Sequence, residues 1–389
     1  MKIVGNSQYQ KGANGLLILN LLRKYPCSRV QIAHELGLQN STVTYSVARL
    51  LENGTVREVE TEKPEVPEVT KIGRKPNLVG LNPDFGRIIG IEMMSGLYRV
   101  CICDICGMVL VKEELHYAKK NSPFQELVAE ALGIASAKCG NFPILGACIA
   151  VPGIVHDGNT CIEECWTHDL KNVEFKPFLQ TFPFPVLFEN DANCCALKYM
   201  FNRDDQNDNF FYLLARKHDS EVVPAGIPTI GLGLGLVVHG KLIRGASSRS
   251  GEYRSSRLMG TKSNGQIDLT EEQLKNLDTD ASIQRDLIKR VFADLFCAIS
   301  IFDPSNFYVG GFLTSLPYRY VLGDVLSHEL QDDWFETKWE GEMILVHDTL
   351  FDPAEGAADK ILELLFKVPH VGSSEPDLRQ WNALLNGII

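Results

Sequence analysis

Residues 186–193 read Val-Leu-Phe-Glu-Asn-Asp-Ala-Asn. The apolar run at 186–188 is typical of a buried strand, and polar side chains follow it at once. Open α/β folds place ligand-contacting groups at the carboxyl ends of their strands, so Glu189, Asn190 and Asp191 are candidate binding residues. A carboxylate beside an amide can hydrogen-bond two adjacent hydroxyls of a sugar. The alternative that Asn190 or Asp191 only caps a helix over 192–200 stays open.

An α/β pattern extends on both sides of this stretch from about residue 85 onward. Apolar runs of strand length alternate with segments of helical periodicity. The predicted strands are 88–93, 98–104, one that begins at 107–110, 145–151, 186–188, 210–215, a glycine-rich hairpin near 229–242, and 306–309, with helices over 124–138 and 281–302. The order of strands followed by a helix occurs twice along the chain, which predicts two lobes around a cleft. We assign residues 85–193 to the first lobe, completed by a C-terminal helix over 373–389, and residues 194–372 to the second lobe.

Two glycine-bearing motifs lie in the predicted second lobe. Gly231, Gly233 and Gly235 alternate within the hairpin, where missing side chains let the backbone approach a phosphate group or a neighbouring strand closely. Glu252 directly follows Gly251, after a serine-rich loop. Each motif has a plain alternative, because glycines are common in hairpins and a lone glutamate is usually a surface residue. Their order along the chain therefore carries more information than either motif alone.

The first 80 residues predict a separate module of three helices and a hairpin. Leucines at 16–22 suit a buried first helix. Ser28 and Gln31 form a capping-box pattern at the start of a second helix. The remaining expected elements are a third helix capped by Asn40 or Ser41 and two wing strands over 56–59 and 78–81.

Helix, tight turn and helix is the arrangement that presents a recognition helix to the major groove of DNA. The outward face of the third helix carries short or hydrogen-bonding side chains, which suit base edges and phosphates. These candidates are Asn40, Ser41, Thr42, Thr44, Tyr45 and Arg49. Arg29, at the start of the second helix, is a candidate phosphate contact, and Arg74 and Lys75 of the wing are candidates for a narrow minor groove. A small helical module used for protein contacts is the alternative.

The charge distribution agrees with a nucleic-acid contact at one end of the chain. The 389 residues carry a formal charge of −11, but residues 1–80 hold eleven Lys/Arg and seven Glu, so they carry +4 and the remainder −15. A basic head on an acidic body is expected when one small domain meets phosphates. No apolar run is long enough for a membrane span and no secretory signal is evident, which predicts a cytoplasmic protein with reduced cysteines.

The order of the motifs resembles the ROK family of repressors and sugar kinases. The order is Pro152-Gly153, Glu189 to Asn193, the glycine hairpin, Gly251-Glu252, Asp303-Pro304 leading to Gly310-Gly311, and Ala354 to Ala358. A winged helix-turn-helix in front is the layout of the family's repressor branch. The resemblance implies an actin-like, hexokinase-like α/β fold of two lobes with a sugar in the cleft. It also implies a repressor of carbohydrate-utilisation genes that responds to a sugar or a sugar derivative. Such a repressor is expected to bind double-stranded operator DNA as a homodimer or a higher homo-oligomer.

The resemblance also assigns roles to residues of the cleft. Family kinases use the aspartate matching Asp191 as the base that deprotonates the attacking sugar hydroxyl, and the residues matching Asn190 and Glu252 hold other hydroxyls. Pro152 and Gly153 complete the expected sugar-binding set. An ATP-dependent sugar kinase that carries a DNA-binding domain, with Asp191 as its catalytic residue, is the alternative function. A module for a protein partner with a vestigial cleft is a third possibility.

This chain departs from the family pattern in two ways. The first argues against kinase activity, and the second argues against a zinc site. Family kinases have closely spaced glycines in their first phosphate-binding loop, where this chain has Met93 and Met94. In the second phosphate-binding loop, at the glycine hairpin, Ile230 replaces the usual threonine. Because phosphoryl transfer depends on positioning and charge stabilisation, we expect no enzyme and no ATP cofactor, and Asp191 as a hydrogen-bond acceptor only. The zinc-binding His after the Gly-Glu pair is absent, and no cysteine occurs between Cys195 and Cys297, so we expect no metal.

Overall fold

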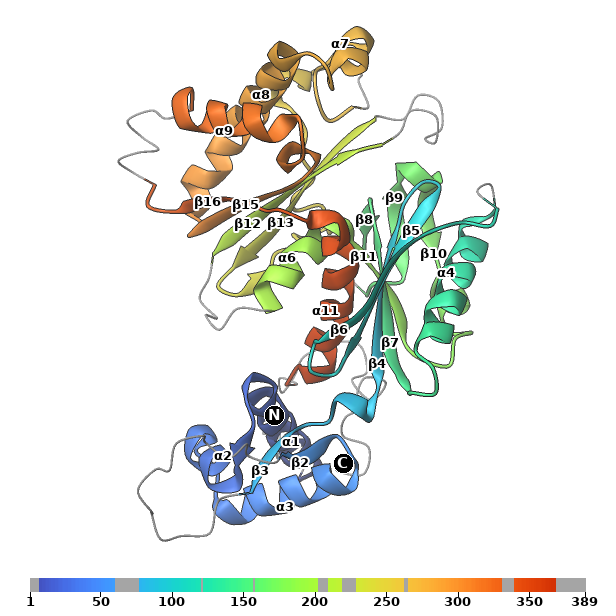
Figure 1. Cartoon of the computed structure of the whole chain (residues 1–389), viewed down its shortest axis with the longest axis vertical. Coiled ribbons are helices and arrows are strands. Elements are labelled where there is room, and N and C mark those ends of the chain that lie inside the picture. Colours follow the sequence, from blue (N-terminus) through green and yellow to red (C-terminus); the bar gives the residue numbers. More distant parts are fainter. Residues whose placement is uncertain are drawn as a thin grey trace, which may run out of the picture.

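A computed structural model of the chain describes residues 7–59, 77–119, 122–156, 158–201, 209–218, 229–261, 265–330 and 339–368. A small N-terminal module lies at one end of the molecule, below two larger lobes that each contain a five-stranded sheet (Figure 1). Among the described residues, no helix is long and apolar enough to cross a membrane.

The N-terminal module is a winged helix-turn-helix, as the sequence predicts. Its helices are α1 (Ser7–Lys24), α2 (Arg29–Leu36) and α3 (Asn40–Glu52), and its strands β1 (Cys27–Ser28), β2 (Val56–Val59) and β3 (Leu78–Leu81) form an antiparallel sheet in the order β1-β3-β2. The capping box of Ser28 and Gln31 is confirmed, with both reciprocal hydrogen bonds present. The predicted cap of α3 is wrong, because Gln39 is the N-cap residue and no side chain caps this helix.

The first lobe is a mixed sheet with a helix on each face. Its strands are β4 (Arg87–Met93), β5 (Leu97–Asp104), β6 (Val109–His116), β7 (Ile144–Val151) and β11 (Val186–Asn190), in the order β11-β7-β4-β5-β6. α4 (Phe124–Lys138) covers one face, and α11 (Asp352–Phe366) covers the other (Figure 1). A smaller sheet of β8 (Ile154–Val155), β9 (Cys161–Cys165) and β10 (Leu170–Glu174) lies beside it, followed by the short helix α5 (Lys176–Leu179).

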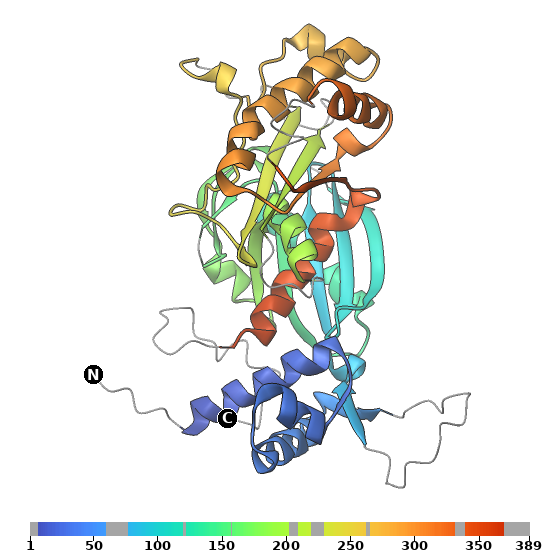
Figure 2. The same cartoon turned by 90° about the vertical axis from the view of Figure 1, so that its left-hand side faces the viewer.

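The second lobe repeats this plan with a sheet in the order β14-β13-β12-β15-β16. Its strands are β12 (Phe210–Lys217), β13 (Ile230–Val238), β14 (Lys241–Leu242), β15 (Asn306–Gly311) and β16 (Glu342–Leu345). α8 (Ala281–Phe302) and α9 (Tyr318–His328) lie on one side of this sheet, with α7 (Glu271–Asn276) beyond them, and α6 (Asp191–Phe201) packs against β13 and β12 from the other side (Figure 2). The helix predicted over 281–302 is confirmed.

One expected lobe boundary needs correction. We placed residues up to 372 in the second lobe, but α11 packs against β4, β7 and α6 and so returns the chain to the first lobe. The physical reason is close backbone contact: a Cβ added at Gly90 of β4 would lie 1.9 Å from the carbonyl oxygen of Ala354. The helix predicted over 373–389 lies outside the described residues.

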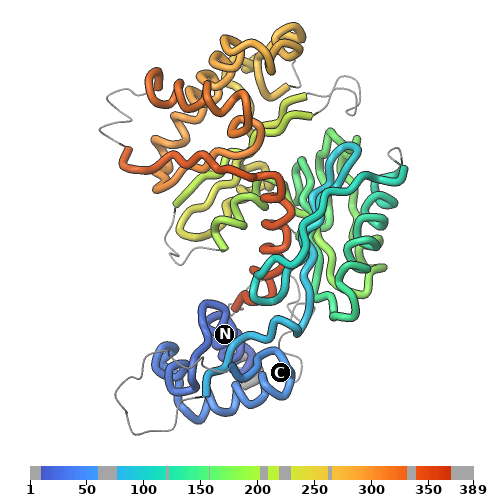
Figure 3. Tube along the Cα trace, in the orientation of Figure 1, coloured from blue at the N-terminus to red at the C-terminus, as the bar shows by residue number. Residues whose placement is uncertain are grey.

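The N-terminal module is anchored to the end of α11 and α6. In α1, Asn20 Nδ2 donates to the carbonyl oxygen of Phe366 at 2.7 Å. The Arg23 guanidinium lies 3.6 Å from the ring centroid of Phe201, the last residue of α6, and 5.7 Å from that of Phe366. One apolar cluster runs from the three helices of the module into the first lobe, so the module has no core of its own that is separate from the lobe. In the Cα trace, the end of α11 lies next to α1 of the module (Figure 3).

We predict that Gly356→Ala lowers the free energy of unfolding by about 3 kcal/mol. A Cβ at this position of α11 would lie 1.7 Å from the carbonyl oxygen of Cys194 in α6, so the two helices must separate. Chemical denaturation of both proteins measures the loss. The matched control is Gly133→Ala in α4, which has no atom within 4 Å and should gain about 0.5–1 kcal/mol. Equal effects of the two substitutions would contradict the proposed close packing.

Candidate functional site

A cleft between the lobes has a volume of about 430 Å³ and contains all the sugar-binding candidates that the sequence indicated. Its lining includes Pro152, Gly153, Asn190, Asp191 and Glu252. The first four come from the carboxyl ends of β7 and β11 and the start of α6, and the last comes from the loop after β14. Segments separated by about 100 residues therefore meet at one site, as the order of motifs implied.

Asn190 and Asp191 have structural bonds as well as access to the cleft. Asn190 Oδ1 accepts from the backbone N–H of Asn193 at 2.9 Å, so the helix-capping alternative is also true of this residue. Its Nδ2 donates to the carbonyl oxygen of Gly153 at 3.0 Å. Asp191 Oδ1 accepts from the N–H of Ala192 at 2.8 Å. These bonds hold the amide and the carboxylate in fixed orientations at the cleft wall, which is the preorganisation that a binding site requires.

Glu252 is held against the glycine hairpin. It forms an isolated antiparallel bridge with Gly233, and Gly251 beside it has φ of +88°, where a Cβ would lie 1.8 Å from the carbonyl oxygen of Leu234. The side chain is open to the cleft, yet desolvation by the cleft walls and then repulsion from Asp191 raise its pKa to about 7. Glu252 can therefore accept or donate a hydrogen bond near neutral pH.

Arg216, which sequence analysis did not single out, joins the two lobes inside the site. From β12 its Nε donates to Asp191 Oδ2 at 2.6 Å, and its Nη2 donates to Glu92 in the first lobe. Glu92 is fully buried and also accepts from Arg99 Nη1 at 3.0 Å. Burial alone would lower the pKa of Arg216, but Glu92 and Asp191 outweigh it and raise that pKa above its ordinary value. The carboxylate of Asp191 is thus neutralised by a residue of the chain itself.

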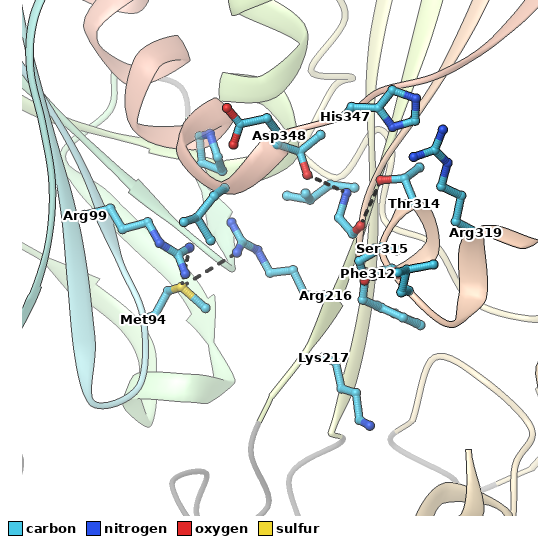
Figure 4. A pocket seen from close by; sticks show the side chains of 17 residues that line it. Met94, Arg99, Arg216, Lys217, Phe312, Thr314, Ser315, Arg319, His347 and Asp348 are labelled. Carbon is cyan, nitrogen blue, oxygen red and sulfur yellow. Dashed lines mark hydrogen bonds between the residues drawn. The ribbon is translucent and has the colours of Figure 1, made fainter. Parts of the chain in front are cut away.

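A second cavity of about 520 Å³ lies on the other side of Arg216 (Figure 4). Met94, which we expected to obstruct the first phosphate-binding loop, lines this cavity. Its sulfur lies 3.2 Å from Arg99 Nη1 and 3.8 Å from Arg216 Nη1. Ile230 lines the 430 Å³ cleft instead. Two guanidinium groups and a methionine therefore separate this cavity from the carboxylates Glu92 and Asp191.

Further ion pairs cross between the lobes near the cleft. Arg244 donates to Glu189, and Arg249 donates to Glu163. Both arginines lie in the loop after β14, while both glutamates belong to the first lobe. This loop thus connects the two walls of the cleft. The sequence offered no local signal for these partners, since they lie 55 and 86 residues apart.

The cleft also contains Trp166 and His218, which sequence analysis did not select. Tyr253 occupies the chain position after Glu252, near where the family pattern has its zinc-binding His; it is buried, and its hydroxyl donates to Asp294 Oδ2 at 2.8 Å. The sequence offered no local signal for these additions, and Arg216 is one of two basic residues at the end of an apolar strand.

Five of the nine DNA-binding candidates are exposed on α2 and α3. In α3, Val43, Val47 and Leu50 are buried against the module, and the opposite face is open to solvent. Asn40, Ser41, Thr44 and Tyr45 are exposed, as is Arg29 at the start of α2, whereas Thr42 and Arg49 are half-buried. Arg49 Nη1 donates to the Tyr45 hydroxyl at 3.0 Å. Arg74 and Lys75 lie outside the described residues.

Fold and cleft together define a class of protein: a two-lobed, sugar-kinase-like domain that carries a winged helix-turn-helix. Residues 88–254, which include Asn190, Asp191 and Glu252, match the model of the ROK family. Over these residues the chain is similar to the ROK family.

The relatives of this chain include both repressors and kinases. The chain is 26% identical over 257 residues to the xylose repressor of Bacillus spizizenii, an alignment that covers 65% of this chain and 62% of the relative. It is 26% identical over 212 residues to the beta-glucoside kinase of Listeria monocytogenes, with 46% and 67% covered. The chain thus spans less than two thirds of the length of the xylose repressor that it matches.

A solved structure of similar fold covers almost the entire chain. It is described as a ROK family transcriptional regulator, a homolog of the E. coli MLC protein. The TM-score is 0.66 at 15% sequence identity, and the match covers 98% of this chain and 99% of that one. The similarity extends over the N-terminal module as well as both lobes, and it shows that the two chains share a fold.

We predict that Arg216→Met lowers the free energy of unfolding by about 3–5 kcal/mol, because it leaves the buried carboxylate of Asp191 without its cation and removes one of the two arginines that bond Glu92. The matched control is Arg285→Met, whose ion pairs with Asp324 and Glu329 are exposed and should contribute at most about 1 kcal/mol. Denaturant titration measures both. Similar losses for the two variants would show that the Arg216 network is not a buried one.

A second prediction concerns pH. Since the folded protein raises the pKa of Glu252 to about 7 from 4.5, the stability linked to its proton is complete below pH 4.5 and is lost as the pH rises through 7. Glu252→Gln keeps the neutral form, so the variant should gain stability relative to the wild type between pH 5 and pH 8. Parallel unfolding free energies for the two proteins across this range would exclude a raised pKa.

Proposed function

We propose that this protein is a sugar-responsive, DNA-binding transcriptional repressor of carbohydrate-utilisation genes, with its effector in the 430 Å³ cleft. The observation that carries the proposal is the course of α6. This helix begins at Asp191 in the cleft and ends at Phe201, which contacts Arg23 of the N-terminal module. A change at the cleft is therefore connected to the DNA-binding head by one helix of eleven residues.

Binding of an effector alters operator affinity only if it favours one arrangement of the lobes and head over another. The cleft meets this requirement in principle, because its walls belong to different lobes and are tied by Arg216, Arg244 and Arg249. A sugar that bonds to Asp191 changes the balance of the Arg216 network. The rearrangement would pass along α6 and α11 to Arg23 and Asn20.

The relatives named xylose repressor support this function and make xylose the first effector to test. Residues exposed on α3 would contact operator DNA in the major groove, and Arg74 and Lys75 of the wing the minor groove. We further propose a homodimer, because a two-fold pair of recognition helices matches palindromic half-sites, and a place of action in the cytoplasm, where the operator is.

We also propose that the protein has no kinase activity, no zinc site and no bound ATP. Arg216 already occupies the carboxylate oxygen through which Asp191 would take a proton. Met94 lies where a phosphate loop would need open backbone. The similarity to a beta-glucoside kinase supports the second candidate, an ATP-dependent sugar kinase with Asp191 as base. ATP turnover with a panel of sugars, abolished by Asp191→Asn, would establish that candidate instead.

The decisive test separates DNA binding from effector response in the full chain. Thr44→Glu places a negative charge on the exposed face of α3 and should weaken binding to the promoter fragment upstream of the gene by at least about tenfold. Ser300→Glu, at an exposed position of α8, makes the same charge change far from the module and should have no effect. Gel-shift titration measures both affinities.

Glu252→Ala should leave operator affinity unchanged and remove its dependence on the sugar that releases the wild-type protein. Loss of DNA binding in this variant would mean that Glu252 supports the fold rather than the response. A wild-type protein that binds neither promoter DNA nor any monosaccharide would overturn the proposed function.

A further inference from the structure

His218 lies at the wall of the 430 Å³ cleft, directly after β12. The residue is 9% exposed. Its backbone N–H donates to the carbonyl oxygen of Thr229 at 2.7 Å, which continues the β12–β13 ladder by one residue. Within the parts of the chain that the structure describes, its imidazole has no hydrogen-bond partner. A buried polar ring without a partner at the surface of a cavity is a group that a ligand can satisfy.

The imidazole is neutral at physiological pH. Burial, followed by the positive charge of Arg216 and the proximity of His168, lowers the pKa of His218 to about 4. A neutral imidazole offers one donor and one acceptor nitrogen, which suits a hydroxyl and does not attract a phosphate. The neighbouring arginine in the cleft wall, Arg216, is already held by Glu92 and Asp191.

Along β12, His218 lies beyond the positions that face Asp191 and Glu252, the residues that we propose bind the first sugar ring. Leu214 pairs with Gly233, the residue that bridges to Glu252, whereas Arg216 pairs with Gly231. His218 follows two residues later on the same face of the strand. Two residues of an extended strand span about 7 Å, roughly the width of one sugar ring with its hydroxyls.

Space in front of His218 depends on a glycine. A Cβ added at Gly231 would lie 3.5 Å from His218 Nε2 and 4.0 Å from Gln266 Oε1. Both polar atoms of the Gln266 amide already bond the backbone of Leu232, at 2.6 and 2.8 Å. His218 is therefore the side chain at this end of the cleft whose hydrogen-bonding groups face the space that Gly231 leaves open.

We propose that His218 forms an outer subsite that hydrogen-bonds the second sugar residue of an uncharged disaccharide or glycoside, while Asn190, Asp191 and Glu252 hold the first. The inference rests on the proposed function, since it names the class of effector for the same cleft. It also adds a specificity residue: the outer subsite distinguishes a disaccharide from its monosaccharide.

Calorimetric titration of the full-length protein tests this with two matched pairs, xylose with xylobiose and glucose with cellobiose. The wild type should bind one disaccharide more tightly than its monosaccharide. His218→Ala should weaken disaccharide binding by about three- to tenfold, the effect of one hydrogen bond, and leave monosaccharide binding unchanged. His328→Ala, on the exposed surface of α9, is the control and should change neither.

Gly231→Ala gives an independent readout that does not require removal of a buried side chain. Its methyl group would make ordinary van der Waals contact with His218 and obstruct the outer subsite, so disaccharide affinity should fall while the melting temperature holds. Equal losses for monosaccharide and disaccharide, or no loss in either variant, would overturn the outer subsite. Tight binding of the monosaccharide with no disaccharide binding would overturn it and leave the proposed function intact. Binding of none of the four sugars to the wild type would count against the proposed function itself.

Discussion

The close packing of α6 on α11 is the contact on which the other features of this molecule depend. Gly356 of α11 sits against the backbone of Cys194 in α6, and no side chain fits between them. At the upper end of the pair, Asp352 accepts from Lys198 Nζ at 2.5 Å and from the Tyr212 hydroxyl at 2.8 Å, so the second sheet is tied to the same two helices. The pair therefore joins both lobes and ends against the N-terminal module.

The polar network around Arg216 has a different role from that of the helix pair. Replacing buried ion pairs by apolar side chains is often neutral or stabilising, so such a network is weak evidence for stability. Here it sets geometry: Glu92 and Arg99 belong to the first lobe, Arg216 to the second, and Asp191 to the helix between them. Arg216 reaches Glu92 only when the two lobes are in this arrangement. The cleft in which we propose that the effector binds is thus lined by a contact that depends on how the lobes are arranged.

Much of the site could be predicted because its signals are local. Asn190 and Asp191 follow a short apolar run, and the end of a strand in such a fold faces a cleft whatever the rest of the chain does. Ser28 and Gln31 cap α2 through bonds that span three residues. Residues that depend on distant partners were not found in this way. Arg216 and His218 look like ordinary strand-end polar residues until the fold places them beside Asp191 and Gly231.

Local patterns in the sequence are sufficient to predict the elements and their chemistry: three N-terminal helices, the third with an exposed polar face, two successive α/β segments, and a carboxylate–amide pair at a strand end. These follow from periodicity, capping and turn residues, which act over a few positions. Three features became visible only in the folded chain: which charges neutralise each other, the return of α11 to the first sheet, and the buried imidazole that lines the cleft. Those outcomes depend on contacts between residues far apart in the chain, such as Gly90 and Ala354, and no local spacing encodes them.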